Sequence, residues 1–87
     1  MTMKKNLTSA ELAEAWKAGK LPLRTAARQH FELVGLWPVS EALLFSLDMM
    51  LGFANLGRMD TMIPLEGDQG LSVGEIIKRF KLEDFLG

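Results

Sequence analysis

The chain has 87 residues, of which 48% are hydrophobic and 24% charged, and its formal net charge is −1. These values fit one small globular domain and exclude a largely disordered chain. The absence of cysteine excludes disulfides and thiolate metal sites, and the single histidine excludes a site built from several histidines.

Residues 1–7 are expected to form a flexible tail, and residues 8–87 a single helical domain. The N-terminal segment is basic but lacks the apolar stretch of a secretory signal. Together with the absence of cysteine, this favours a cytoplasmic location. No stretch has the roughly 20 apolar residues of a membrane span, so no membrane association is expected.

Two short helices are predicted in the first half of the domain. Thr8 and Glu11 have the spacing of a capping box, and Gly19 is placed to end the helix that they begin. A second helix is predicted to end at Gly35, because its apolar side chains recur at the intervals of one helix face. His30 lies on that face and is interpreted as a core or boundary histidine rather than a catalytic one.

The longest apolar stretch, SEALLFSLDMMLGFANLG, covers residues 40–57. Ser40 suits an N-cap and Gly57 suits the residue after a helix, so a helix is predicted over about residues 41–56. Its polar residues recur every seven positions: Glu41, Asp48 and Asn55. A surface helix needs an apolar stripe of only about 100°. Since nearly all the rest of this helix is apolar, we expect it to be buried on several sides.

The remainder of the chain is predicted to add one loop and one helix. Residues 58–70 form the loop, which is expected to be extended around residues 62–65. Ser72 and Glu75 then have the spacing of a capping box for a helix over about residues 73–81. The predicted fold class is therefore all-α, a small four-helix domain with a buried central helix. Because so short a chain has a marginal core, we expect dimerisation to complete it.

The segment LSVGEIIKRFKL, residues 71–82, resembles the first helix of the bacterial helix-turn-helix family, which has segments of the type SVGEIAKRLGL. The resemblance implies DNA binding, with a turn and a recognition helix that follow and read the major groove. Only residues 83–87 follow this segment in the sequence, so no recognition helix is expected there. The segments LTSAELAEAW and LPLRTAARQH fit the same pattern only with a longer connection than the usual turn.

Six residues are candidates for partner binding. They are Arg24, Arg28, Asp48, Gly52, Met59 and Met62. The two arginines form a basic edge, and Asp48 is suited to pair with a basic group of a partner. Gly52 beside it allows another backbone to approach closely. The methionines suit a surface that adapts to a partner, with ordinary core filling as the alternative. The alternative interpretation of Asp48 is that it belongs to a narrow polar line of the helix that faces solvent.

The function expected from the sequence is that of a small non-enzymatic adaptor, inhibitor or regulator that covers a surface of a protein partner. Small helical proteins of this kind are common among phage and plasmid accessory proteins. The alternative is a dimeric, helical, DNA-binding transcriptional regulator that binds nucleic acid with the basic edge from Lys17 to Arg28, which also includes Lys20 and Arg24. No enzyme activity, cofactor or metal is predicted, and a homodimer is expected.

Overall fold

The computed structural model of the chain describes residues 7–65 and 70–87. Its elements are α1 (Ser9–Lys17), α2 (Leu23–Leu33), α3 (Glu41–Asn55), β1 (Met62–Ile63), β2 (Leu71–Ser72), α4 (Val73–Arg79) and a 3-10 turn, η1 (Glu83–Phe85). The described part is mostly helical, as the sequence predicts, and none of its helices is both long and apolar enough to cross a bilayer. The predicted tail lies outside the described residues except for Leu7, which packs against the core.

The ends of the helices follow from local sequence signals. The Thr8 hydroxyl accepts from the Glu11 N–H at 3.1 Å, and the Glu11 carboxylate accepts from the Thr8 N–H at 2.8 Å, which confirms the capping box. The hydroxyls of Ser40 and Ser72 accept from backbone N–H groups in the first turns of α3 and α4. Glycines with positive φ follow α1, α2 and α3 in turn: Gly19, Gly35 and Gly57. Without a Cβ, glycine adopts this left-handed conformation at little cost, so the predicted ends are confirmed.

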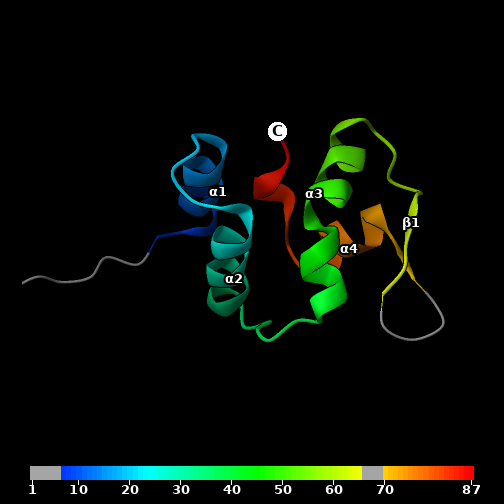
Figure 1. Cartoon of the computed structure of the whole chain (residues 1–87), viewed down its shortest axis with the longest axis horizontal. Helices are drawn as coiled ribbons and strands as arrows, with labels where there is room; N and C mark the ends of the chain where they lie inside the picture. The colour runs from blue at the N-terminus through cyan, green and yellow to red at the C-terminus, as the bar shows by residue number, and fades with distance from the viewer. Residues whose placement is uncertain (1–6, 66–69) are drawn as a thin grey trace, which may run out of the picture.

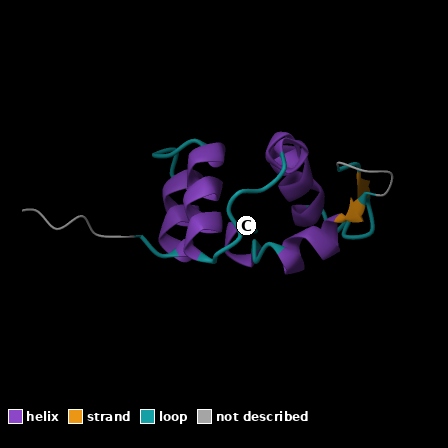
Figure 2. Ribbon diagram, turned by 90° about the horizontal axis from the view of Figure 1, so that it is seen from below, coloured by secondary structure: helices purple, strands orange, loops and turns teal. Residues whose placement is uncertain are grey.

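The helices form two groups that are joined by the last residues of the sequence. Helices α1 and α2 pack side by side at one end of the molecule, and α3 and α4 lie at the other (Figure 1). Figure 2 shows the same separation from below, with the C-terminal segment between the groups. The Lys17 ammonium donates to the Leu86 carbonyl oxygen at 2.8 Å, and the Gly87 N–H donates to Asn55 Oδ1 at 2.9 Å. The segment 82–87 therefore connects α1 to α3.

A single hydrophobic core receives side chains from all four helices, from β1 and from the C-terminal segment. Phe85 of η1 is fully buried, and its ring centroid lies 5.8 Å from that of Trp16 in α1 and 5.3 Å from that of His30 in α2. Among the described residues, no buried side-chain nitrogen or oxygen lacks a hydrogen-bond partner.

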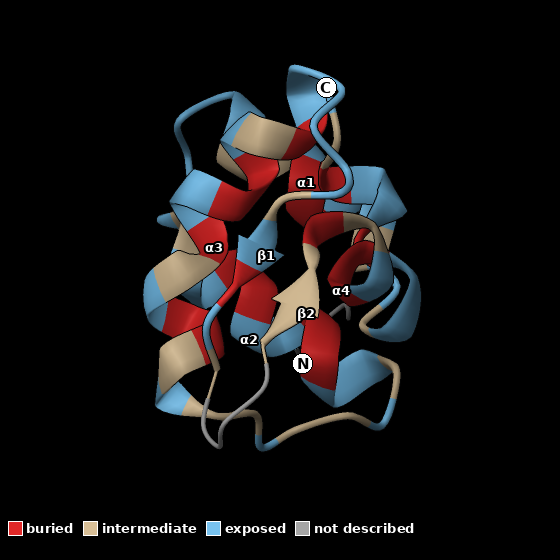
Figure 3. Cartoon of the chain, turned by 90° about the vertical axis from the view of Figure 1, so that its right-hand side faces the viewer, coloured by how far each residue is buried: buried red, intermediate tan, exposed pale blue. Residues whose placement is uncertain are grey.

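Helix α3 is buried along one side, whereas the sequence predicts burial on several sides. Its buried residues are Leu43, Leu44, Leu47, Met50, Leu51 and Ala54. On another side, Phe45 and Leu56 are each 73% exposed and Met49 is 48% exposed. Figure 3 shows red segments of α3 turned toward the interior and tan and pale-blue segments along its outer side. The physical reason is that α1 packs on α2 and η1 rather than on α3, so α3 is covered mainly by α2 and α4.

The segment between α3 and α4 contains a small β-ladder where the sequence predicts a loop. The antiparallel pairs are Met62 with Ser72 and Ile63 with Leu71. The prediction of extended backbone near Met62 is confirmed, but the pairing with a second strand was not predicted. A Cβ added at Gly70 would overlap the Ile63 carbonyl oxygen, so glycine allows the chain to return this closely. Residues 66–69 of the predicted loop lie outside the described residues.

Candidate functional site

A cleft of about 600 Å³ lies between α2 and the start of α3, and we call it the α2–α3 cleft. Its lining residues are Arg24, Thr25, Arg28, Gln29 and Glu32 from α2, Trp37 from the linker, and Glu41 and Leu44 from α3. The linker, residues 34–40, contains the Trp37–Pro38 peptide bond, which is cis. The cleft therefore presents two cations, two anions, an indole and one aliphatic side chain.

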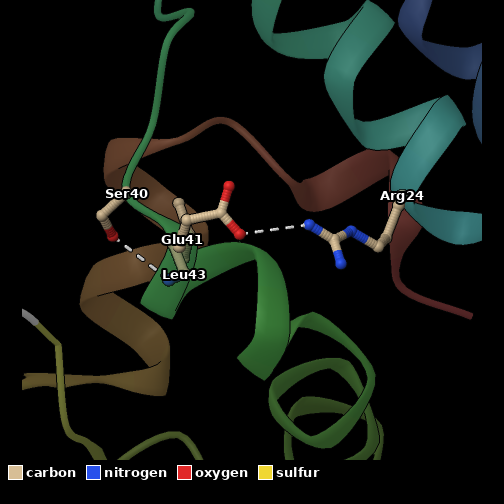
Figure 4. Close-up of polar contacts among 4 residues, drawn as sticks. All are labelled: Arg24, Ser40, Glu41 and Leu43. Atoms are coloured by element: carbon tan, nitrogen blue, oxygen red, sulfur yellow. Dashed lines mark hydrogen bonds and ion pairs between the residues drawn. The ribbon is translucent and has the colours of Figure 1, made fainter.

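Arg24 reaches from α2 to the first two turns of α3. Its Nη2 lies 3.4 Å from Glu41 Oε1, and its Cζ lies 5.1 Å from the centroid of the Phe45 ring. Figure 4 shows the contact with Glu41 and the cap below it, in which the Ser40 hydroxyl accepts from the Leu43 N–H at 3.1 Å. The arginine and the glutamate are both exposed to solvent, so this ion pair contributes at most about 1 kcal/mol to stability.

Arg28 lies one helical turn further along α2 and has a similar environment. Its Nε lies 3.4 Å from Glu32 Oε2, and its Cζ lies 4.9 Å from the centroid of the Trp37 ring. The basic edge predicted from the sequence is therefore present in space, but each arginine faces a glutamate and rests on an aromatic ring. The sequence predicts neither aromatic contact, because both depend on tertiary structure.

A second surface runs along the exposed side of α3. It consists of Phe45, Met49, Gly52 and Leu56, which we call the α3 stripe. These residues follow the spacing i, i+4, i+7 and i+11, so they form one line along the helix. Phe45 belongs to this stripe and also contacts Arg24, so the stripe begins at the α2–α3 cleft. Asp48 is exposed on the same helix and forms no ion pair with any described residue.

The other predicted partner-binding residues are also exposed, but they lie in different surroundings. Gly52 has no heavy atom within 4 Å of an added Cβ, so the fold of this chain does not require glycine there. Met59 and Met62 lie beyond the end of α3, and Met59 packs beside Gly74 of α4. The structure thus brings Arg24 and Arg28 together at the cleft and places Gly52 on the stripe.

His30 is buried in the core and does not line either surface. Its Nε2 is 2.9 Å from the Phe80 carbonyl oxygen, and its Nδ1 is 2.6 Å from Ser9 Oγ. A carbonyl oxygen only accepts, so Nε2 carries a proton and donates. In the neutral imidazole, Nδ1 then accepts from the Ser9 hydroxyl. The interpretation of His30 as a core or boundary residue is confirmed, and its ring forms two hydrogen bonds.

No model of a protein family, no curated protein and no solved structure matches the chain. Residues 71–82, which resemble the first helix of a helix-turn-helix, contain β2 and α4 in the structure, and η1 follows them. Because Phe85 of η1 is buried in the core, this element is not available to read a DNA groove. Within residues 7–65 and 70–87, no group of three or more histidine, aspartate and glutamate side chains is placed to hold a metal ion.

Proposed function

We propose that the protein is a small protein-binding module that covers a surface of its partner with the α3 stripe. The observation that carries this proposal is the alignment of exposed apolar side chains, with Phe45 and Leu56 each 73% exposed. Single exposed apolar residues are ordinary on protein surfaces. Phe45, Met49 and Leu56 instead lie on one line about 16 Å long, given a rise of about 1.5 Å per residue, with Gly52 between the last two.

The chemistry of the stripe favours a protein partner. Phenylalanine and methionine provide large contact areas, and methionine adapts its shape to what it meets. Gly52 allows a partner backbone to approach closely, and the fold of this chain does not itself require glycine at this position. The neighbouring polar residues of α3 supply the hydrophilic rim that surrounds the core of a typical interface: Glu41, Asp48 and Asn55.

Covering a partner in this way suits an adaptor, an inhibitor or a regulator, because none of these roles needs a reactive group. The DNA-binding alternative has less support. Arg24 and Arg28 are balanced by Glu41 and Glu32 at 3.4 Å, so the α2–α3 cleft has no excess positive charge. Nucleic-acid sites usually carry a clear excess of arginine and lysine.

Capture from a lysate of the native host tests the proposal when stripe and control variants are compared. Immobilised wild-type protein is expected to retain a specific protein that Met49→Ser/Leu56→Ser does not retain, because serine removes the apolar contact area. Leu33→Ser is the matched control, since Leu33 lies on α2 and is 48% exposed, as Met49 is. It should retain the same protein as the wild type. Equal retention by the stripe variant would contradict the proposal.

Homodimerisation stays a prediction from the sequence, and the α3 stripe is the surface on which we test it. A stable dimer usually buries about 800 Å² on each subunit, so a second copy would have to contact more than the four residues of the stripe. If the homodimer exists, sedimentation velocity at micromolar concentrations should show a dimer for the wild type and a monomer for Met49→Ser/Leu56→Ser. A wild-type monomer at every concentration would contradict the homodimer and leave the stripe free for another protein.

A further inference from the structure

We infer that the α2–α3 cleft binds a carboxylate side chain of the partner, on the same segment whose apolar residues cover the α3 stripe. The occupant is therefore an acidic, amphipathic segment of a protein. This inference rests on the proposed function, because it specifies the chemistry of the partner that the stripe binds.

The guanidinium groups of the cleft have N–H donors that are not used within the chain. The Cζ atom of Arg24 lies 5.1 Å from the centroid of the Phe45 ring, and that of Arg28 lies 4.9 Å from the centroid of the Trp37 ring. A guanidinium has five N–H donors, and each of these two contacts only one carboxylate oxygen, at 3.4 Å. That distance is long for a hydrogen bond between nitrogen and oxygen. The remaining donors are therefore able to bind a carboxylate with both of its oxygens.

The two glutamates of the cleft are easily exchanged for a carboxylate from outside. Glu41 is 70% exposed and contacts Arg24 through one oxygen, and the pair of Glu32 with Arg28 has the same form. Exposed ion pairs of this kind add little to the stability of a fold. A partner carboxylate can therefore replace either glutamate, which remains hydrated when it turns into solvent.

The balance of charges in the cleft favours a peptide over a nucleic acid. A nucleic acid would bring several phosphates against Glu32 and Glu41, whereas one carboxylate displaces a single glutamate. The cleft also has apolar walls, Trp37 and Leu44, which suit an apolar neighbour of the acidic residue. Because Phe45 lies under Arg24 and also begins the stripe, one bound segment is able to reach both places.

Selection from a displayed library of random short peptides tests this inference on the intact protein. The wild type is expected to select peptides that combine aspartate or glutamate with apolar residues. Arg24→Gln/Arg28→Gln should select apolar peptides without this enrichment of acids, and it should bind a wild-type-selected peptide about tenfold more weakly. Arg79→Gln is the matched control, because Arg79 on α4 is equally exposed and has a similar pair with Glu75 at 3.3 Å. It should select the same peptides as the wild type.

The outcomes separate this inference from the function on which it rests. Suppose that aspartate and glutamate are equally frequent in the peptides selected by the wild type and by Arg24→Gln/Arg28→Gln, and that Met49→Ser/Leu56→Ser selects no peptides. The inference is then wrong, and the protein-binding function is supported. If the wild type selects no peptides, the inference is wrong, and the lysate capture with Met49→Ser/Leu56→Ser decides the protein-binding function separately. Binding of short duplex DNA that is lost in Arg24→Gln/Arg28→Gln, without any enrichment of acidic peptides, would also overturn the inference in favour of nucleic acid.

Discussion

The variant Leu47→Asp is expected to lose the folded state, with the circular dichroism of an unfolded chain and no cooperative transition in urea. Leu47 lies on the buried side of α3 and is 1% exposed. Loss of its packing alone costs about 2–5 kcal/mol. An unpaired carboxylate in the same place adds several kcal/mol more. The sum is comparable with the whole stability of a domain of this length, about 4–13 kcal/mol.

The control for this variant is Phe45→Asp, which places the same charge two residues earlier on the same helix. Phe45 is 73% exposed, and its ring contacts the Arg24 guanidinium. Stability should therefore change by only about 1 kcal/mol, measured by urea denaturation under the same conditions. A folded Leu47→Asp variant, or an unfolded Phe45→Asp variant, would contradict the assignment of the two sides of α3.

The second large effect is expected at the buried histidine. His30→Leu should lower the free energy of unfolding by about 2–4 kcal/mol, because it removes two hydrogen bonds and leaves the Phe80 carbonyl oxygen without its donor. The imidazole connects the first turn of α1, through Ser9, to the end of α4. The measurement is urea denaturation, in which the midpoint concentration should fall while the slope of the unfolding free energy against urea concentration stays the same.

A double-mutant cycle distinguishes lost hydrogen bonding at His30 from altered packing. Ser9→Ala removes only the hydroxyl that donates to Nδ1, so it should cost about 1 kcal/mol. In the His30→Leu background this hydroxyl no longer has its partner, and Ser9→Ala should then have almost no effect. If the two single costs add, the hydrogen bond between Ser9 and His30 does not contribute to stability.

The sequence predicted the helices well because their ends depend on local chemistry. Thr8, Ser40 and Ser72 each cap a helix by accepting from a backbone N–H three residues later, and each is recognisable from its own neighbourhood. A glycine directly after a helix is an equally local signal. Gly57 follows α3 and has the positive φ, 79°, that ends a helix. The interpretation of His30 as a core residue also holds, because its spacing places it on the apolar face of α2.

The candidate site was only partly predictable, since it depends on contacts between elements. Hydrophobicity does not show which apolar residues of α3 remain uncovered, because Phe45 and Leu47 are equally suited to a core. The contact of Arg24 with Phe45 joins two helices and leaves no periodic signal in the sequence. The β-ladder has only two residues in each strand, which is too short for an alternating pattern to appear.

The contacts of residues 82–87 have a consequence for the nascent chain. Lys17 bonds to the Leu86 carbonyl oxygen, 69 residues further along, and Phe85 fills the space beside Trp16. The contacts of α1 with this segment therefore form only after residues 82–87 have left the ribosome, and closing so long a loop costs entropy. Until then the rings of Trp16 and His30 lack their contact with Phe85. Synthesis is therefore the period in which this chain is most exposed to aggregation and to chaperones.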